Sequence, residues 1–143
     1  GGSMLLHPVV HLHLFNSCGE LYLQKRPAWK DIQPGRWDTA VGGHVDWGEE
    51  PLVALRREVR EEVGVTDFEP QHVLTYLFES ERERELVYVY KTVYDGPVVP
   101  SGELDGGRFW TLREIAEGVG GGIFTPNFEG EIRRVAELPD VGR

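Results

Sequence analysis

The sequence predicts an α/β domain in which helices pack on a mixed β-sheet. Its apolar segments run in the order strands, one helix, further strands and two helices. A length of 143 residues suits one domain, and a hydrophobic content of 40% is enough for a core. No repeat or low-complexity tract divides the chain. We expect residues 4–143 to form a single domain, because Gly1, Gly2 and Ser3 before Met4 resemble an expression-tag remnant.

The strands are predicted from β-branched and aromatic runs bounded by turn residues. Five segments have this composition: residues 9–15, 20–26, 37–45, 72–79 and 85–94. The NSCG sequence between the first two predicts a hairpin turn. The charged run 80–84 predicts a loop joining the last two as a second antiparallel hairpin.

The last third of the chain predicts one short strand and two helices. Phe109 and Trp110 begin the strand, and a weak helix follows over residues 112–118. A glycine-rich loop at 118–122 precedes a final helix over 126–138. Ile132, Val135 and Ala136 are expected on the apolar side of that helix.

A helix over residues 51–63 has the clearest boundaries. Pro51 suits the first helical position, where its missing N–H costs nothing, and Gly64 suits the left-handed position after the end. The spacing of its large aliphatic residues predicts one buried stripe: Leu52, Leu55, Val59 and Val63.

Three glutamates, Glu58, Glu61 and Glu62, share another face of this helix. Clustered carboxylates are typical ligands of Mg²⁺ together with water and phosphate oxygens. Arg57 lies within the same turns and could hold one carboxylate by a bidentate pair. The alternative is a solvated acidic face, since like charges at this spacing cost only about 0.2–0.5 kcal/mol per pair.

Composition narrows the classes of partner. The net charge of −9 argues against sequence-independent binding to nucleic acid and fits a ligand that arrives with divalent cations, or simply a soluble surface. Cys18 is the only cysteine, which excludes an internal disulfide and leads us to expect a reducing, cytoplasmic location. The apolar run LLHPVVHLHLF is too short to cross a bilayer, so no membrane association is expected.

A longer pattern contains the acidic helix. Gly43 is followed after five residues by Glu49 and after seven more by REVREEVGV, residues 57–65. This matches the Nudix box, GX5EX7REUXEEXGU with U aliphatic, at every fixed position. The chain therefore resembles the Nudix hydrolases, specifically over residues 12–65 and more generally beyond. That resemblance implies an α/β/α sandwich with a mixed sheet.

The resemblance also implies a site. It assigns Glu58, Glu61 and Glu62, with the carbonyl of Gly43, as ligands of Mg²⁺ or Mn²⁺. Glu49 and Arg57 would brace the loop against the helix, and Glu61 or Glu58 would act as the catalytic base. The implied reaction is hydrolysis of a small-molecule diphosphate linked to a group X. A nucleoside, a sugar and an isoprenoid remain open as X, as does a homodimer.

The lead-in LYLQKRPAWKDIQPGRWDTAVGGHVDWGE resembles isopentenyl-diphosphate isomerase and its Nudix relatives. Lys25, Arg26 and Lys30 would contact phosphates there, and Trp47 is a candidate for lining the site. Trp29, Trp37 and Phe128 are further candidates for stacking on a planar group, although Trp37 fits a core position better.

Further isomerase features are only partly present. His44 matches an isomerase metal ligand, and Glu83 with Glu85 resembles an acidic pair beside that site. The alternatives are that His44, after a glycine pair, has a structural role and that Glu83 and Glu85 belong to a solvated loop. The isomerases carry a catalytic cysteine where this chain has Gly42, which favours hydrolysis. The alternatives are an isomerase-like enzyme and a non-catalytic Nudix-fold binding module, although every box carboxylate is retained.

Overall fold

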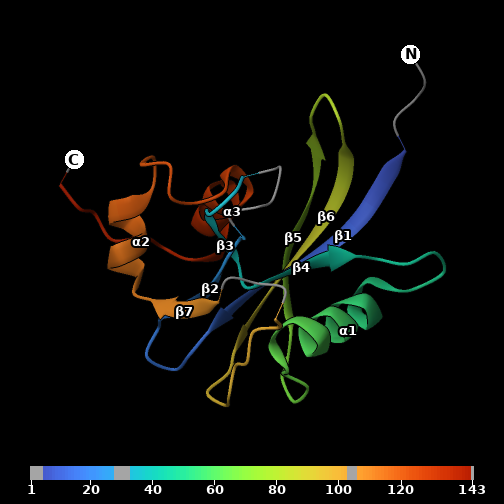
Figure 1. The fold of residues 1–143 in the computed structure, drawn as a ribbon, viewed down its shortest axis with the longest axis horizontal. Coiled ribbons are helices and arrows are strands. Elements are labelled where there is room, and N and C mark those ends of the chain that lie inside the picture. The colour runs from blue at the N-terminus through green and yellow to red at the C-terminus, as the bar shows by residue number, and fades with distance from the viewer. Residues whose placement is uncertain (1–4, 28–32, 103–105, 143) are drawn as a thin grey trace.

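A computed structural model describes residues 5–27, 33–102 and 106–142, and its elements follow the predicted order. The strands are β1 (Leu6–Phe15), β2 (Leu21–Lys25), β3 (Trp37–Thr39), β4 (Val41–His44), β5 (Gln71–Glu79), β6 (Arg84–Val93) and β7 (Gly107–Trp110). The helices are α1 (Pro51–Val63), α2 (Leu112–Gly118) and α3 (Pro126–Val135). The predicted α/β class with a mixed sheet is confirmed (Figure 1).

Strand β1 is the centre of the sheet. Along one edge it pairs in parallel with β6 over its whole length, and β5 continues the sheet as the antiparallel partner of β6. Along the other edge it pairs antiparallel with β4 in its first half and with β2 at its end. Strand β2 in turn carries β3 and β7. The sheet is therefore mixed, and among the described strands β1 and β6 form its one parallel pair.

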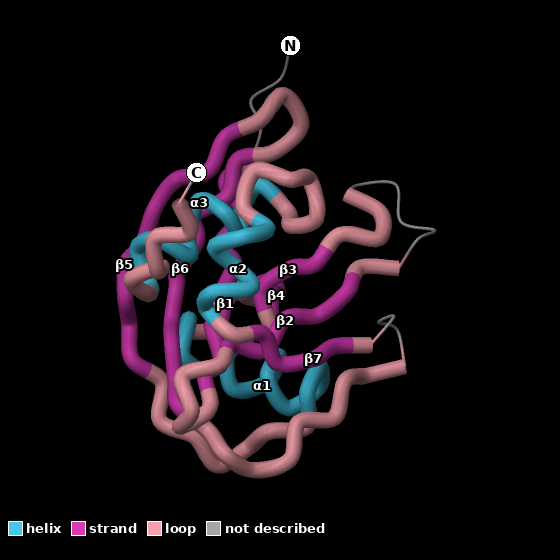
Figure 2. The backbone as a smooth tube through the Cα atoms, turned by 90° about the vertical axis from the view of Figure 1, so that its left-hand side faces the viewer, coloured by secondary structure: helices cyan, strands magenta, loops and turns pink. Residues whose placement is uncertain are grey.

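Alternate residues of β1 face two different layers. Val10, Leu12 and Leu14 are fully buried in a core shared with α1. Val9 packs instead with β6 and with Val135 of α3. Helix α1 thus covers one face of the sheet and α3 the other; Figure 1 shows α1 well separated from α2 and α3, and in Figure 2 α1 lies below both.

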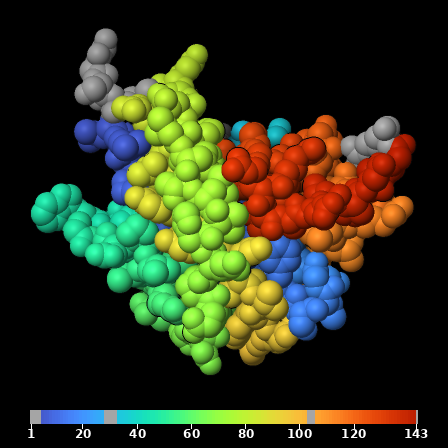
Figure 3. Space-filling model, turned by 180° about the vertical axis from the view of Figure 1, so that it is seen from behind, coloured from blue at the N-terminus to red at the C-terminus, as the bar shows by residue number. Residues whose placement is uncertain are grey.

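A second core joins the C-terminal helices to β2 and β7. Trp110, Phe124 and Phe128 pack there with their ring centroids 5.2 Å apart in succession. Phe128 is completely buried, so the expectation that it stacks on a ligand is wrong. Trp37 packs against the same core, as expected. Figure 3 shows the C-terminal segment lying beside the β5–β6 segments on the far side of the molecule.

Helix α1 has the predicted bounds and the predicted left-handed end. Gly64 has φ +70°, and its N–H donates to the carbonyl of Arg60. Leu55, Val59 and Val63 are fully buried, but Leu52 is 47% exposed and does not belong to the stripe. Ala54 of the same turn is fully buried in the core instead.

Two other predicted elements differ in length. The single strand expected over 37–45 is divided at Ala40 into β3, which pairs with β2, and β4, which pairs with β1. The last helix ends at Val135 rather than near 138, although Ile132, Val135 and Ala136 do pack inward. Within the described part of the chain, no helix is long and apolar enough to span a membrane.

Candidate active site

The acidic face of α1 borders a cleft of about 1310 Å³. Its other walls come from β1, the ends of β2 and β3, the glycine pair of β4, the β5–β6 turn and the start of α3. Of the residues singled out from the sequence, nine line it: Arg26, Gly42, Gly43, His44, Glu58, Glu61, Glu62, Glu83 and Glu85. The fold thus brings the glutamates of the box together with residues from the second half of the chain.

Arg57 ties the loop before α1 to the helix, as expected of a brace. Its Nε and one terminal nitrogen donate to the two carboxylate oxygens of Glu49 at 3.1 and 2.9 Å. The same side chain donates to Glu58 at 2.7 Å and to the carbonyl of His44 at 3.0 Å. Hydrogen bonds from Arg57 and from the backbone N–H of Asp46 lower the pKa of Glu49, so the bracing carboxyl is ionised.

Gly43 lies directly against Glu58. An ideal Cβ at this position would stand 2.2 Å from the carboxylate carbon of Glu58 and 2.4 Å from one carboxylate oxygen. Any side chain here would displace the carboxylate of Glu58 from its present position, because ordinary carbon contacts are about 3.5–4.0 Å. The absence of a side chain brings the backbone of Gly43 beside a glutamate oxygen, as a shared ligand shell needs.

Glu58 and Glu62 form a close carboxyl pair. Burial, a hydrogen bond that protonated Glu62 donates to Glu58, and the charge of Glu58 raise the pKa of Glu62 to about 9, although the N–H of Gly42 also donates to Glu62. Two adjacent, partly buried carboxyl groups without a cation between them share a proton instead. This donor set of hard oxygens fits Mg²⁺ or Mn²⁺.

Glu61 stands further out, with 54% of its side chain exposed and an ion pair to Arg57 at 3.7 Å. Across the described residues, no three His, Cys, Asp or Glu side chains are already gathered at metal-binding distance. Glu58 and Glu62 are therefore adjacent as the chain stands, whereas Glu61 would have to turn inward to join them.

Of the residues expected to contact substrate, some line the cleft and others do not. Arg26 lines the cleft and pairs with Asp38 at 3.6 Å. Lys25 ends β2 without lining the cleft, and Lys30 lies outside the described residues. Trp47 is fully exposed on the loop between β4 and α1, away from the cleft, so its proposed role as a lining residue is corrected.

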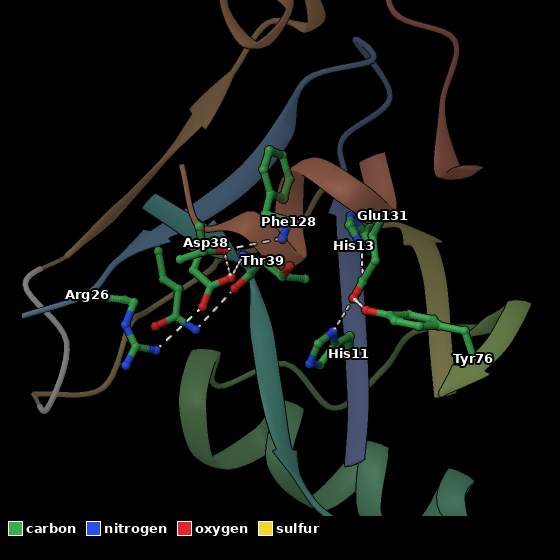
Figure 4. Close-up of polar contacts among 10 residues, drawn as sticks. His11, His13, Arg26, Asp38, Thr39, Tyr76, Phe128 and Glu131 are labelled. Atoms are coloured by element: carbon green, nitrogen blue, oxygen red, sulfur yellow. Dashed lines mark hydrogen bonds and ion pairs between the residues drawn. The ribbon is translucent and has the colours of Figure 1, made fainter. Parts of the chain in front are cut away.

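A buried polar network, which was not predicted from the sequence, reaches the cleft through His11. Glu131 of α3 is 2% exposed and accepts hydrogen bonds from His11 at 2.7 Å, His13 at 2.9 Å and the hydroxyl of Tyr76 (Figure 4). Two signals were present: His11 and His13 alternate along one face of β1, and Glu131 occupies an apolar-stripe position between Phe128 and Ile132.

In this network, burial shifts each pKa in one direction, and hydrogen bonds and neighbouring charges shift it in the other. Burial alone would raise the pKa of Glu131, but hydrogen bonds and charge from His11 and His13 hold it well below its usual range. Burial alone would lower the pKa of His11, but Glu131, with the charges of Asp38 and Glu85, raises it. The ionised carboxylate of Glu131 and the protonated form of His11 thus stabilise each other inside the protein.

Comparison with known proteins gives the family. The NUDIX domain matches residues 5–128. A Nudix hydrolase of Pseudomonas aeruginosa without a described activity is 36% identical over 97 residues, covering 67% of this chain and 57% of that protein. An isopentenyl-diphosphate Delta-isomerase of Serratia proteamaculans is 30% identical over 118 residues, covering 79% of this chain and 64% of the enzyme.

The fold is shared as well. The crystal structure of a MutT protein from Methanosarcina mazei superposes with a TM-score of 0.78 at 24% identity, covering 94% of this chain and 95% of that one. The match to each of the two sequence relatives spans less than two thirds of that relative's length.

Proposed function

The chain belongs to the Nudix family, and from this premise we propose that it hydrolyses a small-molecule diphosphate carrying a polar group X, with a divalent cation as cofactor. The observation that carries the proposal is the gathering of Glu58, Glu62 and Gly43 at one wall of the cleft, braced by Arg57. A solvated acidic face would need neither the brace nor a glycine pressed against a carboxylate.

Each residue has a distinct role in the proposal. Glu58, Glu61, Glu62 and the carbonyl of Gly43 would hold Mg²⁺ or Mn²⁺, which on binding supplies charge neutralisation of the diphosphate and a more acidic water. Glu58 or Glu61 would accept the proton of the attacking water. Arg57, bonded to both Glu49 and Glu58, would keep the helix carboxylates in register with the loop.

The cleft wall supports a polar X. Opposite the acidic helix it presents Gln24, Asp38, Thr125 and Asn127, while its large apolar side chains are few, chiefly Val9 and Phe78. Gln24 is fixed by donating to the carbonyl of Thr39 at 3.1 Å, and Asp38 accepts from Thr125 at 2.8 Å. Fixed polar groups favour a nucleoside or sugar, because an isoprenoid chain would exclude water from their remaining hydrogen-bonding positions and offer no partner in exchange.

Incubation with Mg²⁺ and a panel of nucleoside, sugar and isoprenoid diphosphates tests the proposal. We expect release of phosphate or a monophosphate from a polar substrate, with label from ¹⁸O-water on a phosphorus-containing product. Glu62→Gln should lower turnover by about 10²-fold or more, since it removes a proposed ligand. Glu50→Gln is the matched control, because Glu50 is exposed and its side chain makes no capping bond. Full turnover in excess chelator would refute the cofactor assignment.

Isomerisation is the second candidate, favoured by the match to the Serratia enzyme. Strand β4 offers Gly42 where the isomerases have a cysteine, and the single cysteine, Cys18, is exposed in the turn after β1. We therefore expect no dimethylallyl isomer from isopentenyl diphosphate and Mg²⁺. Formation of that isomer, lost in Glu85→Gln but retained in Cys18→Ala, would favour an isomerase that works without cysteine. Tight metal-dependent binding of a diphosphate with neither reaction would favour the binding module.

A further inference from the structure

His11 is the one member of the buried network that reaches the cleft. Its side chain is 14% exposed and lines the cleft, whereas His13 is completely buried and Glu131 is 2% exposed. The network therefore connects a carboxylate inside the protein to one imidazole at the cleft surface.

The tautomer of His11 follows from its partner. Its Nδ1 lies 2.7 Å from a carboxylate oxygen of Glu131, and an ionised carboxylate can only accept, so Nδ1 carries a hydrogen. Figure 4 shows the other ring nitrogen pointing away from Glu131, towards β4. An ideal Cβ at Gly42 would stand 3.4 Å from Cδ2 and 3.7 Å from Nε2, which places this ring edge over the glycine pair.

The charge of the network belongs on His11 rather than on His13. The Nε2 of His13 is bonded to Glu131, and its Nδ1 is buried without a hydrogen-bond partner. A proton on that Nδ1 would bury an unpaired N–H, which is costly. On His11 the second proton would face the cleft, where the neighbouring charged groups, Asp38 of β3 and Glu85 of β6, are acidic.

We propose that His11, held by Glu131, donates a hydrogen bond from Nε2 to an anionic oxygen of the bound diphosphate. The proposal rests on the proposed function and adds a substrate-contacting cation beside the carboxylates of α1. Gly42, beneath the ring edge, also donates its N–H to Glu62, so Nε2 and the proposed metal ligands face the same part of the cleft. Glu131, Tyr76 and His13 act as positioning residues that fix the ring and balance its charge.

His11→Asn is the sharpest variant. An asparagine amide can occupy the place of Nδ1 and keep the bond to Glu131, but it has nothing at the place of Nε2. We expect kcat/KM to fall about 10- to 100-fold, as for the loss of a hydrogen bond to a charged group. His72→Asn is the matched control, because His72 is exposed near the start of β5, does not line the cleft and shares a hydrogen bond with Thr75 at 2.8 Å. It should keep wild-type kcat/KM.

Nuclear magnetic resonance of the imidazole nitrogens gives a readout that needs no variant. In wild-type protein with Mg²⁺, titration with methylenediphosphonate, a diphosphate that resists hydrolysis, should shift His11 Nε2 and leave His72 unchanged. In Glu131→Gln, the His11 nitrogens should show a neutral ring before any probe is added, which a merely structural role of Glu131 would not produce.

The outcomes separate the two proposals. A wild-type protein that hydrolyses no diphosphate and does not bind the probe refutes the proposed function and, with it, the role of His11. A wild-type protein that hydrolyses a diphosphate, while His11→Asn stays within twofold and Nε2 does not shift, overturns the role of His11 alone.

Discussion

Replacing Gly43 with alanine tests whether the carboxylate of Glu58 must stand where it does. The new Cβ would lie 2.2 Å from the carboxylate carbon, and restoring an ordinary contact of about 3.5 Å requires a shift of about 1.3 Å. Glu58 is a flexible side chain at the protein surface, so it can turn aside at a cost of about 0.5–1.5 kcal/mol in rotamer strain. The melting temperature should therefore fall by no more than about 5 °C.

Activity should respond far more strongly than stability. A displacement of about 1 Å in a catalytic constellation can cost about 10²-fold, so we expect kcat to fall by that order. The turn of Glu58 would also break its 2.7 Å bond from Arg57. Turnover on the best diphosphate and thermal unfolding, measured on the same preparation, test both halves of the prediction.

Gly130→Ala is the control for Gly43→Ala. Gly130 lies in α3, is exposed and has open space around its Cα, so alanine should stabilise the helix by up to about 1 kcal/mol without changing turnover. If Gly43→Ala kept kcat within threefold, Glu58 would have no need of its present position. If it lost more than about 10 °C in melting temperature together with its activity, the effect would be on folding and the reasoning would fail.

Three further predictions concern stability. Millimolar Mg²⁺ or Mn²⁺ should raise the melting temperature and chelator should reverse the rise, because a ligand of the native state alone stabilises it; no shift in either direction would count against the metal site. Thr111→Ala should cost about 1 kcal/mol, measured by urea unfolding, since Thr111 and Glu114 cap α2 reciprocally at 3.0 and 2.9 Å. The buried network should give most stability between about pH 4.5 and 6.5. Because the pKa of Glu131 is lowered, its contribution to folding stability is complete above about pH 4.5 and is lost as the pH falls. Because the pKa of His11 is raised, its contribution is complete below about pH 6.5 and is lost as the pH rises. Glu131→Gln should flatten this dependence of the urea midpoint and cost about 3–5 kcal/mol, and an unchanged pH profile would contradict the pairing.

The features that could be predicted from the sequence depend on residues that lie close together along the chain. Pro51 and Gly64 mark the two ends of α1, and α1 has the predicted bounds. The short helix predicted over residues 112–118 is also observed over those residues. The brace between Glu49 and Arg57 spans eight residues and lies within one loop and helix. Such features are decided by propensity, capping and spacing, which a single sequence contains.

What could not be predicted depends on tertiary packing. The bonds from His11 and His13 to Glu131 join residues 120 and 118 positions apart, and only the docking of α3 on β1 makes them neighbours. The same packing decides the exposure of Leu52, whose spacing fits the buried stripe although its side chain is 47% exposed. Hydrophobic periodicity predicts which face of a helix is apolar, but it does not predict which residues along that face are covered by the rest of the protein.

The parallel pairing of β1 with β6 also bears on the order in which the protein acquires its structure. Leu6 pairs with Arg84 and Phe15 with Val93, so the central strand, synthesised first, has no partner on that edge until 78 further residues follow. Contacts of such separation close slowly, because chain entropy opposes them before other contacts can form. The apolar residues of β1 would meanwhile depend on β2 and β4, which arrive within about 35 residues and pair with its other edge. A nascent chain released before β6 would expose a strand of valines and leucines along an open edge, the arrangement most prone to aggregation.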